Sequence, residues 1–179
     1  FDLHANVRPV RAYDGVGPEG MDLTIVRQNT EGSYADRNMF VGDGRFMPTE
    51  DVSLSVRVVT RRECRRIAET AFERAEAGDA VTAVQKSNVL KHGDGMFLEE
   101  CRAVAEHHPE VDLETTLVDA FAMELVREPA SHDVVVTTNL FGDILSDEAA
   151  GVVGSLGLAP ALNHGEEYAM AQAAHGAAP

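Results

Sequence analysis

Short runs of β-branched residues alternate with segments of helical periodicity along this sequence, and the alternation restricts the fold more than any other feature. HDVVVTT (132–138) has the length and composition of a buried strand and leads into NLFGDILSDEAAGVVG (139–154), which has helical character. AVTAVQK (80–86) and LETTLVD (113–119) are further strands, and a helical segment follows each of them. Strands that alternate with helices predict an α/β fold with crossover connections, a mixed sheet with flanking helices.

The first third of the chain adds a strand, an antiparallel element and a helix. DLTIVR (22–27) predicts a strand, and VSLSVRVVT (52–60) alternates as a strand does, so we expect a hairpin or an extended arm in that region. Thr60 is a suitable N-cap for the helical segment that follows. Glu63 completes the spacing of a capping box, and Gly78 is the expected terminator of this helix.

Composition excludes several classes of function. Fifteen Lys and Arg residues against 30 Asp and Glu residues give a formal net charge of −15, which repels nucleic acid and anionic membranes. No apolar run approaches the roughly 20 residues that span a bilayer, so we expect a soluble, cytoplasmic protein. Cys64 and Cys101 lack a CxxC spacing and are expected to be reduced helix residues. HExxH, GxSxG and Walker-type motifs do not occur in the sequence.

Three acidic residues are candidate metal ligands. Asp143 and Asp147 lie four residues apart in a helical segment, so their carboxylates project from one face and repel unless a cation lies between them. Asp119 ends the predicted strand 113–119, and strand ends are where open α/β sheets present ligand-binding groups. Converging carboxylates suit Mg²⁺ or Mn²⁺, although the DxxxD spacing alone more often marks a solvated helix face.

Four further residues are candidates for proton transfer or anion binding. Lys86 follows a buried strand, where a lysine serves either as a general base or as a solubilising surface residue. The phenol of Tyr34 either donates a proton or packs half-buried. Arg8 and Arg27 lie outside the predicted helices, and their guanidinium groups either bind carboxylates or form surface ion pairs.

Six segments in this order resemble the isocitrate and isopropylmalate dehydrogenase family. They are NVRP, IVRQNTEGSY, QKSNVLK, LVDAFAMELVR, VVVTTNLFGDILSDEAAGVVGSLGLAP and AHGAAP. The resemblance extends almost from end to end of the chain, and six motifs in order are far more specific than any one of them. It implies NAD(P)-dependent oxidative decarboxylation of a 2-hydroxy acid that bears a further carboxylate.

The resemblance also implies a role for each candidate residue. Arg8 and Arg27 would hold substrate carboxylates, Lys86 would take the hydroxyl proton, and Tyr34 would protonate the carbon that loses CO₂. A bound Mg²⁺ or Mn²⁺ would stabilise the resulting enolate. The metal ligands would be Asp119, Asp143 and Asp147, with Asp119 also counted as catalytic. Contacts to NAD, with NADP not excluded, would come from Asn88, His175 and Gly176.

Proteins of this family share the active site across a homodimer. Lys86 and Asp119 would reach into the partner's cleft, residues 36–54 would form the dimer arm, and residues 139–152 would pack at a helical interface. We expect residues 1–152 to form the substrate-binding and dimerisation domain and 153–179 to begin the return to a cofactor-binding domain. The first residue is not Met, and we expect a fragment that covers about the middle half of the family.

The expected substrate is 3-isopropylmalate, with isocitrate, homoisocitrate, tartrate or malate as alternatives. RQNTEG is nearer to the RENTEG of isocitrate, homoisocitrate, tartrate and archaeal-type isopropylmalate enzymes than to the RELTGG of many bacterial isopropylmalate enzymes. A catalytically incomplete module for dimerisation and substrate binding is the remaining alternative for the chain by itself.

Overall fold

A computed structural model describes residues 1–34 and 41–173. Within these ranges one seven-stranded mixed sheet has the order β6-β5-β7-β2-β1-β8-β9. Its strands are β1 (Ala5–Arg11), β2 (Asp22–Gln28), β5 (Ala80–Gln85), β6 (Asp112–Leu117), β7 (Val134–Thr137), β8 (Ala161–His164) and β9 (Ala169–Gln172). Strands β6, β5, β7 and β2 are parallel, whereas β1, β8 and β9 each pair antiparallel with their neighbours. The expected mixed α/β sheet is confirmed.

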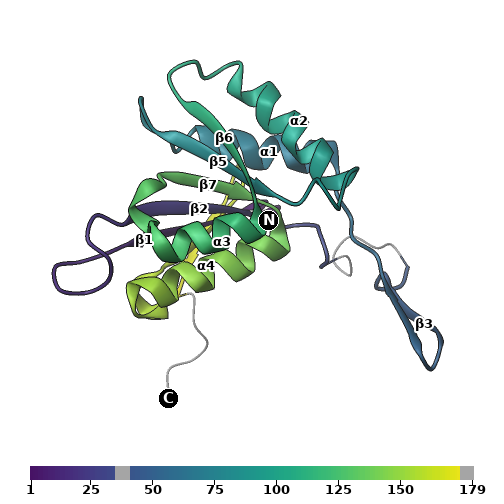
Figure 1. Cartoon of the computed structure of the whole chain (residues 1–179). Helices are drawn as coiled ribbons and strands as arrows, with labels where there is room; N and C mark the ends of the chain where they lie inside the picture. The colour runs from purple at the N-terminus through teal and green to yellow at the C-terminus, as the bar shows by residue number, and fades with distance from the viewer. Residues whose placement is uncertain (35–40, 174–179) are drawn as a thin grey trace.

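Helices cover both faces of the sheet (Figure 1). On one face lie α1 (Arg61–Phe72) and α2 (Gly93–Ala105), and on the other α3 (Val118–Arg127) and α4 (Asn139–Val153). Strand β7 shows why its sequence is continuously apolar: Val134 and Val136 join the core under α1 and α2, and Val135 joins the core under α3 and α4. Among the described residues, Pro129–Ser131 and Leu156–Leu158 form short 3₁₀ helices.

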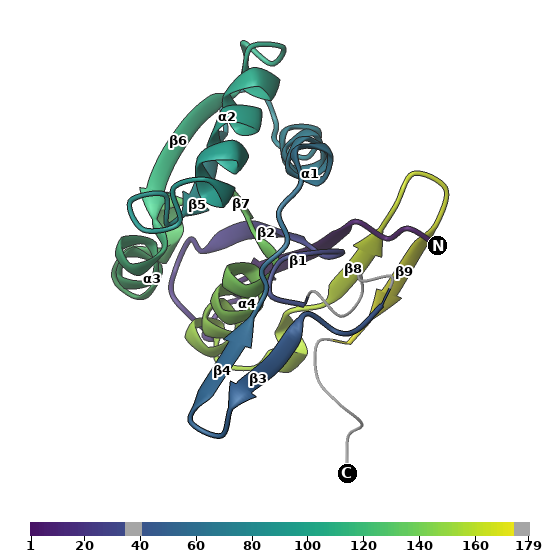
Figure 2. The same ribbon diagram turned by 90° about the vertical axis from the view of Figure 1, so that its right-hand side faces the viewer.

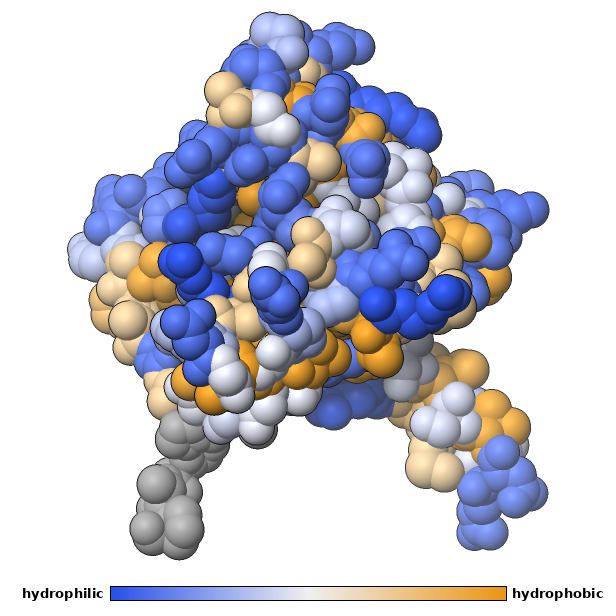
Figure 3. Space-filling model, turned by 60° about the vertical axis from the view of Figure 1, so that its left-hand side comes forward, coloured by the Kyte–Doolittle hydropathy of each residue, from blue (hydrophilic) through white to orange (hydrophobic). Residues whose placement is uncertain are grey.

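A separate hairpin of β3 (Arg45–Thr49) and β4 (Val52–Ser55) extends away from the sheet (Figure 1). The predicted hairpin is therefore confirmed for residues 45–55, while residues 36–40 of the expected arm lie outside the described residues. All side chains of both strands are exposed, Phe46 and Met47 among them. Apolar groups on the hairpin at the lower right of Figure 3 thus face solvent in the single chain.

Helix α1 begins as predicted and ends earlier. The Thr60 side chain accepts a hydrogen bond from the Glu63 backbone N–H at 3.3 Å, as an N-cap does. The reciprocal bond of the capping box is different, because the Thr60 N–H donates to the Glu31 carboxylate at 2.9 Å, while Glu63 pairs with Arg66.

The end of α1 at Phe72 corrects the expected terminator Gly78. Asp79 explains the difference, since its carboxylate accepts the Glu76 backbone N–H at 2.8 Å and thereby favours a turn over continued helix. Gly78, with a φ of +99°, lies within the loop that leads into β5 rather than at the helix end.

The remaining strands extend the sheet towards the C-terminus. Strand β8 pairs with β1, and β9 forms the edge beyond it, as Figure 2 shows.

The proposed domain boundary between residues 152 and 153 stays a prediction. In the part of the chain that the structure describes, no helix is both long and apolar enough to cross a lipid bilayer. Cys64 and Cys101 are free and buried, and burial raises the pKa of the Cys64 thiol to about 12.

Candidate active site

The two acidic residues of α4 face two arginines from the sheet. Arg8 lies in β1 and Arg27 in the adjacent β2, and both side chains are directed at the helix that crosses this face. Arg8 donates from Nη1 to Asp147 at 2.9 Å and to the Ser146 hydroxyl at 2.7 Å. Arg27 forms an ion pair and a hydrogen bond with Asp143. Asp143 and Asp147 thus share one helix face, as predicted, and each is paired with the guanidinium group of an arginine.

Gly142 allows this close approach between α4 and β2. A Cβ at this position would lie 2.6 Å from both Cβ and Cγ of Arg27, which is closer than side-chain atoms pack. Asn139, one turn earlier, accepts a hydrogen bond from Arg27 Nε at 2.9 Å and donates to the Glu31 carbonyl at 2.7 Å. The Arg27 guanidinium is therefore held from both sides and is almost fully buried.

Tyr34 completes this first group of residues. Its hydroxyl donates to Asp143 Oδ2 at 2.8 Å, and the Arg27 guanidinium carbon lies 5.7 Å from the centre of the ring. Partial burial, and then the hydrogen bond to Asp143, raise the pKa of Tyr34. The phenol consequently keeps its proton at neutral pH and can act as a proton donor.

Lys86 and Asp119 form a second group. Lys86 directly follows β5, and its ammonium group pairs with the Asp119 carboxylate. The hydrogen bond from Lys86 holds the pKa of Asp119 below its usual range. The expected position of Asp119 at a strand end is wrong, because β6 ends at Leu117 and Asp119 lies in the first turn of α3. An acidic residue is favourable there because the positive end of the helix dipole is nearby.

The two groups are separate within one chain. Among residues 1–34 and 41–173, no three acidic, histidine or cysteine side chains lie close enough together to hold a metal ion. Asp119 therefore does not join Asp143 and Asp147 in a three-ligand site of a single subunit. The carboxylate oxygens of Asp143 and Asp147 are hard donors that fit Mg²⁺ or Mn²⁺, and two of them leave room for substrate oxygens and a further ligand.

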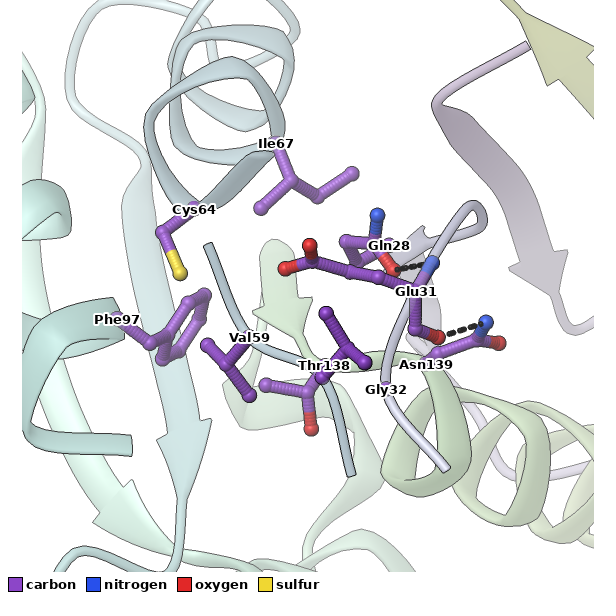
Figure 4. Close-up of a pocket in the computed structure, with 10 residues that line it drawn as sticks. Gln28, Glu31, Gly32, Val59, Cys64, Ile67, Phe97, Thr138 and Asn139 are labelled. Atoms are coloured by element: carbon purple, nitrogen blue, oxygen red, sulfur yellow. Dashed lines mark hydrogen bonds between the residues drawn. The ribbon is translucent and has the colours of Figure 1, made fainter. Parts of the chain in front are cut away.

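A small cavity lies next to the first group, between β2, α1 and α4 (Figure 4). The Glu31 carboxylate extends into it towards α1, near Cys64 and Ile67, and its Oε2 atom is buried without a hydrogen bond to any described residue. Burial raises the pKa of Glu31, although the Thr60 N–H opposes the shift. Glu31 therefore ties the loop after β2 to the start of α1.

The structure tests the positions of the cofactor candidates only in part. Asn88 is exposed in the turn after Lys86, which is an accessible position for a ligand contact. His175 and Gly176 lie outside the described residues.

The sequence analysis missed Asn139, Gly142 and Ser146, which set the geometry of the arginines. A glycine inside a helical segment was the available signal for Gly142, because glycine is unfavourable there unless close packing requires it.

Comparison with known proteins identifies the family of this chain. The sequence model of the family described as isocitrate/isopropylmalate dehydrogenase matches residues 1–179. The chain belongs to this family. A 3-isopropylmalate dehydrogenase of Methanothermobacter thermautotrophicus is 46% identical over 184 residues, which cover 100% of this chain and 53% of that protein. A mitochondrial isocitrate dehydrogenase [NAD] catalytic subunit of Arabidopsis thaliana is 42% identical over 184 residues, 100% of this chain and 47% of that protein.

Solved structures show the same relationship to the family. The crystal structure of isocitrate dehydrogenase from Methylococcus capsulatus has a TM-score of 0.87 and 41% sequence identity. The match covers 98% of this chain and 52% of that chain. The chain therefore spans about half the length of the curated relatives it matches.

Proposed function

We propose that the protein containing this chain oxidises and decarboxylates a 2-hydroxy acid that bears a further carboxylate, with NAD or NADP as the hydride acceptor. The observation that supports this most is the convergence of Arg8 and Arg27 on Asp143 and Asp147. Two guanidinium groups provide forks for substrate carboxylates, and two carboxylates one turn apart provide hard donors for a divalent cation. An anionic substrate and a cation can then bind side by side.

The residues of the first group would hold Mg²⁺ or Mn²⁺ through Asp143 and Asp147. When bound, such a cation polarises the substrate oxygen and stabilises the negative charge that develops as CO₂ leaves. Arg8 and Arg27 orient the substrate, and because both are nearly buried they lose little freedom when it binds.

Two proton transfers fall to Lys86 and Tyr34. Lys86 would take the proton of the substrate hydroxyl, and a bound nicotinamide cofactor would supply the acceptor for the hydride of the same carbon, which gives a 2-oxo acid. Loss of CO₂ leaves an electron pair on the neighbouring carbon, and Tyr34 supplies the proton that this carbon accepts. The raised pKa of Tyr34 suits a group that must remain protonated until this step.

The separation of the two groups supports a homodimer with shared active sites. Lys86 and Asp119 of one subunit would complete the group of Arg8, Arg27, Tyr34, Asp143 and Asp147 of the other. Exposed apolar side chains are available for contact on the hairpin and on the two helices α3 and α4: Phe46, Met47, Leu54, Met123, Val126, Leu140 and Ile144. A lone subunit is expected to be catalytically incomplete.

We propose 3-isopropylmalate as the substrate. The relative at 46% identity is named 3-isopropylmalate dehydrogenase, whereas the relative at 42% identity is named isocitrate dehydrogenase. Isocitrate, homoisocitrate, tartrate and malate are the alternatives.

The test measures reduction of NAD and of NADP by the full-length protein with each of these five acids, with and without Mn²⁺. We expect turnover that requires Mn²⁺ and is fastest with 3-isopropylmalate. Faster turnover of another acid would change the substrate assignment, and no turnover of any acid would contradict the proposed reaction.

A further inference from the structure

A fully buried carboxylate holds the backbone of Lys86. Asp94, in the first turn of α2, has no exposed surface, and its Oδ2 atom accepts the Lys86 backbone N–H at 2.6 Å. The Lys86 carbonyl accepts the backbone N–H groups of Val89 at 3.0 Å and Leu90 at 2.8 Å. The N–H and C=O groups of Lys86 are thus both hydrogen-bonded. These bonds fix the direction in which the side chain leaves the backbone.

Arg57 neutralises this buried carboxylate. Its Nη1 atom lies 2.7 Å from Asp94 Oδ1, and its side chain is 21% exposed. A buried charge without a counter-ion is strongly unfavourable, so a charged Asp94 at this position depends on the cation beside it. Arg57 therefore influences Lys86 through Asp94, without a contact of its own to Lys86 among the interactions described.

Arg57 also contacts the start of α4. Its Nη2 atom donates to the Thr138 hydroxyl at 3.2 Å, and its guanidinium carbon lies 5.9 Å from the centre of the Phe141 ring. Thr138 is the N-cap residue of the helix that bears Asp143 and Asp147. Arg57 itself lies just after β4, where the hairpin joins the body of the protein. One guanidinium group, from a residue just after the hairpin, thus contacts both the buried carboxylate that holds Lys86 and the start of α4.

We propose that the Arg57–Asp94 ion pair is a positioning unit that fixes Lys86 relative to α4. Neither residue touches substrate; each acts through the backbone of Lys86 or through the first turn of α4. The pairing differs from the surface ion pairs of this protein, because Asp94 is fully buried and its second oxygen is bonded to the residue to be positioned. A role for this unit in catalysis rests on the proposed function. The structural coupling of Arg57 and Asp94 to Lys86 and α4 does not.

The test is hydrogen–deuterium exchange of the Lys86 amide in the full-length protein, measured by mass spectrometry with residue-level fragmentation. Arg57→Met removes the cation but keeps an unbranched side chain of similar reach. We expect exchange at Lys86 to accelerate by about tenfold or more, since the buried carboxylate loses its counter-ion and releases the amide. The amide of Val84 in β5 should keep its protection, which would show that the sheet is intact.

Arg11→Met is the matched control, because Arg11 forms an exposed ion pair with Asp22 at the far end of β1. This variant should leave exchange at Lys86 unchanged. Arg57→Lys should restore most of the protection because it restores the positive charge. Unchanged exchange at Lys86 in Arg57→Met would overturn the proposal.

If Arg57→Met does not fold, Asp94→Asn decides the matter. Asparagine keeps an acceptor for the Lys86 amide and removes only the charge that Arg57 holds, so faster exchange at Lys86 supports the ion pair and unchanged exchange overturns it. Steady-state kinetics separate this inference from the proposed function: we expect a lower kcat for Arg57→Met, largely restored in Arg57→Lys, with little change in the KM for substrate. Altered exchange in a protein that turns over none of the acids would uphold the positioning unit and contradict only the reaction.

Discussion

At the scale of single residues, Gly142 controls how Arg27 is presented. The Cβ and Cγ atoms of Arg27 occupy the space that a Cβ at residue 142 would need. Asn139 and Asp143 hold the guanidinium group farther along the same side chain. The position of Arg27, which we expect to bind substrate, thus depends on the absence of a side chain at residue 142 of α4.

Gly142→Ala should displace Arg27 and weaken substrate binding. The added methyl group cannot avoid Cβ of Arg27, so we expect a loss of about 1–3 kcal/mol in the free energy of unfolding and a rise in the KM for the hydroxy acid. Gly151→Ala is the control in the same helix, because nothing lies within 4 Å of its added Cβ. Alanine there should leave KM unchanged and raise stability by up to about 1 kcal/mol. Equal effects of the two variants would contradict this role of Gly142.

Glu31 makes the stability of the protein depend on pH. Burial raises its pKa in the folded state above the usual value of 4.5, so the folded protein binds this proton more tightly than the unfolded chain does. The stability contributed by the protonated form is present below pH 4.5 and is lost as pH rises through the folded-state pKa.

Glu31→Gln should remove this loss. Urea unfolding from pH 4.5 upward is expected to show that the free energy of unfolding of the variant, relative to the wild type, increases with pH. Glu19→Gln, at an exposed position, should show no such trend. A constant difference between Glu31→Gln and wild type across this range would refute the assignment.

At the scale of elements, periodicity predicted β2, β5, β6 and β7 and the four α-helices, because burial on two faces leaves a clear apolar pattern in strands such as β7. It did not predict β1, β8 and β9. It missed that α1 ends at Phe72, before the turn held by Asp79, and that Asp119 lies in the first turn of a helix instead of ending a strand. It also missed that Glu31 takes the place of Glu63 in the capping box, because that contact joins residues that are 29 positions apart in the sequence.

The residues of the candidate site also divide into those that the sequence predicted and those that it did not. Ordered motifs indicated the arginines, the acidic pair, Lys86 and Tyr34, and the structure groups them into two sets. Asp94 and Asn139 were not predicted, since a buried carboxylate and a helix-end amide acquire their roles only from what the fold places beside them.

The hairpin is the element whose role is most open to a direct test. Leu54 and Ser53 are adjacent exposed residues of β4 and project to opposite faces of the strand. If the apolar face packs against a second subunit, Leu54→Asp should weaken the dimer of the full-length protein by about tenfold or more, because it buries an unpaired charge. Ser53→Asp should have little effect. Analytical ultracentrifugation measures both, and a dimer unaffected by Leu54→Asp would argue against the hairpin as a dimer arm.

At the scale of the whole molecule, the proposed active site is built from two chains. One subunit presents arginines, Tyr34 and two carboxylates, and Lys86 with Asp119 forms a group of its own. Neither group alone contains both the proposed general base and the proposed pair of metal-binding carboxylates. Activity should therefore belong to the dimer.

Mixing two inactive variants tests this claim most directly. Lys86→Met removes the general base and Asp143→Asn removes a metal ligand, so each full-length homodimer should be inactive. If the two are unfolded and refolded together, half of the dimers are mixed and each mixed dimer has one site with both groups intact. We predict recovery of about a quarter of wild-type activity. No recovery, from mixed dimers shown to have formed, would contradict a site shared between subunits.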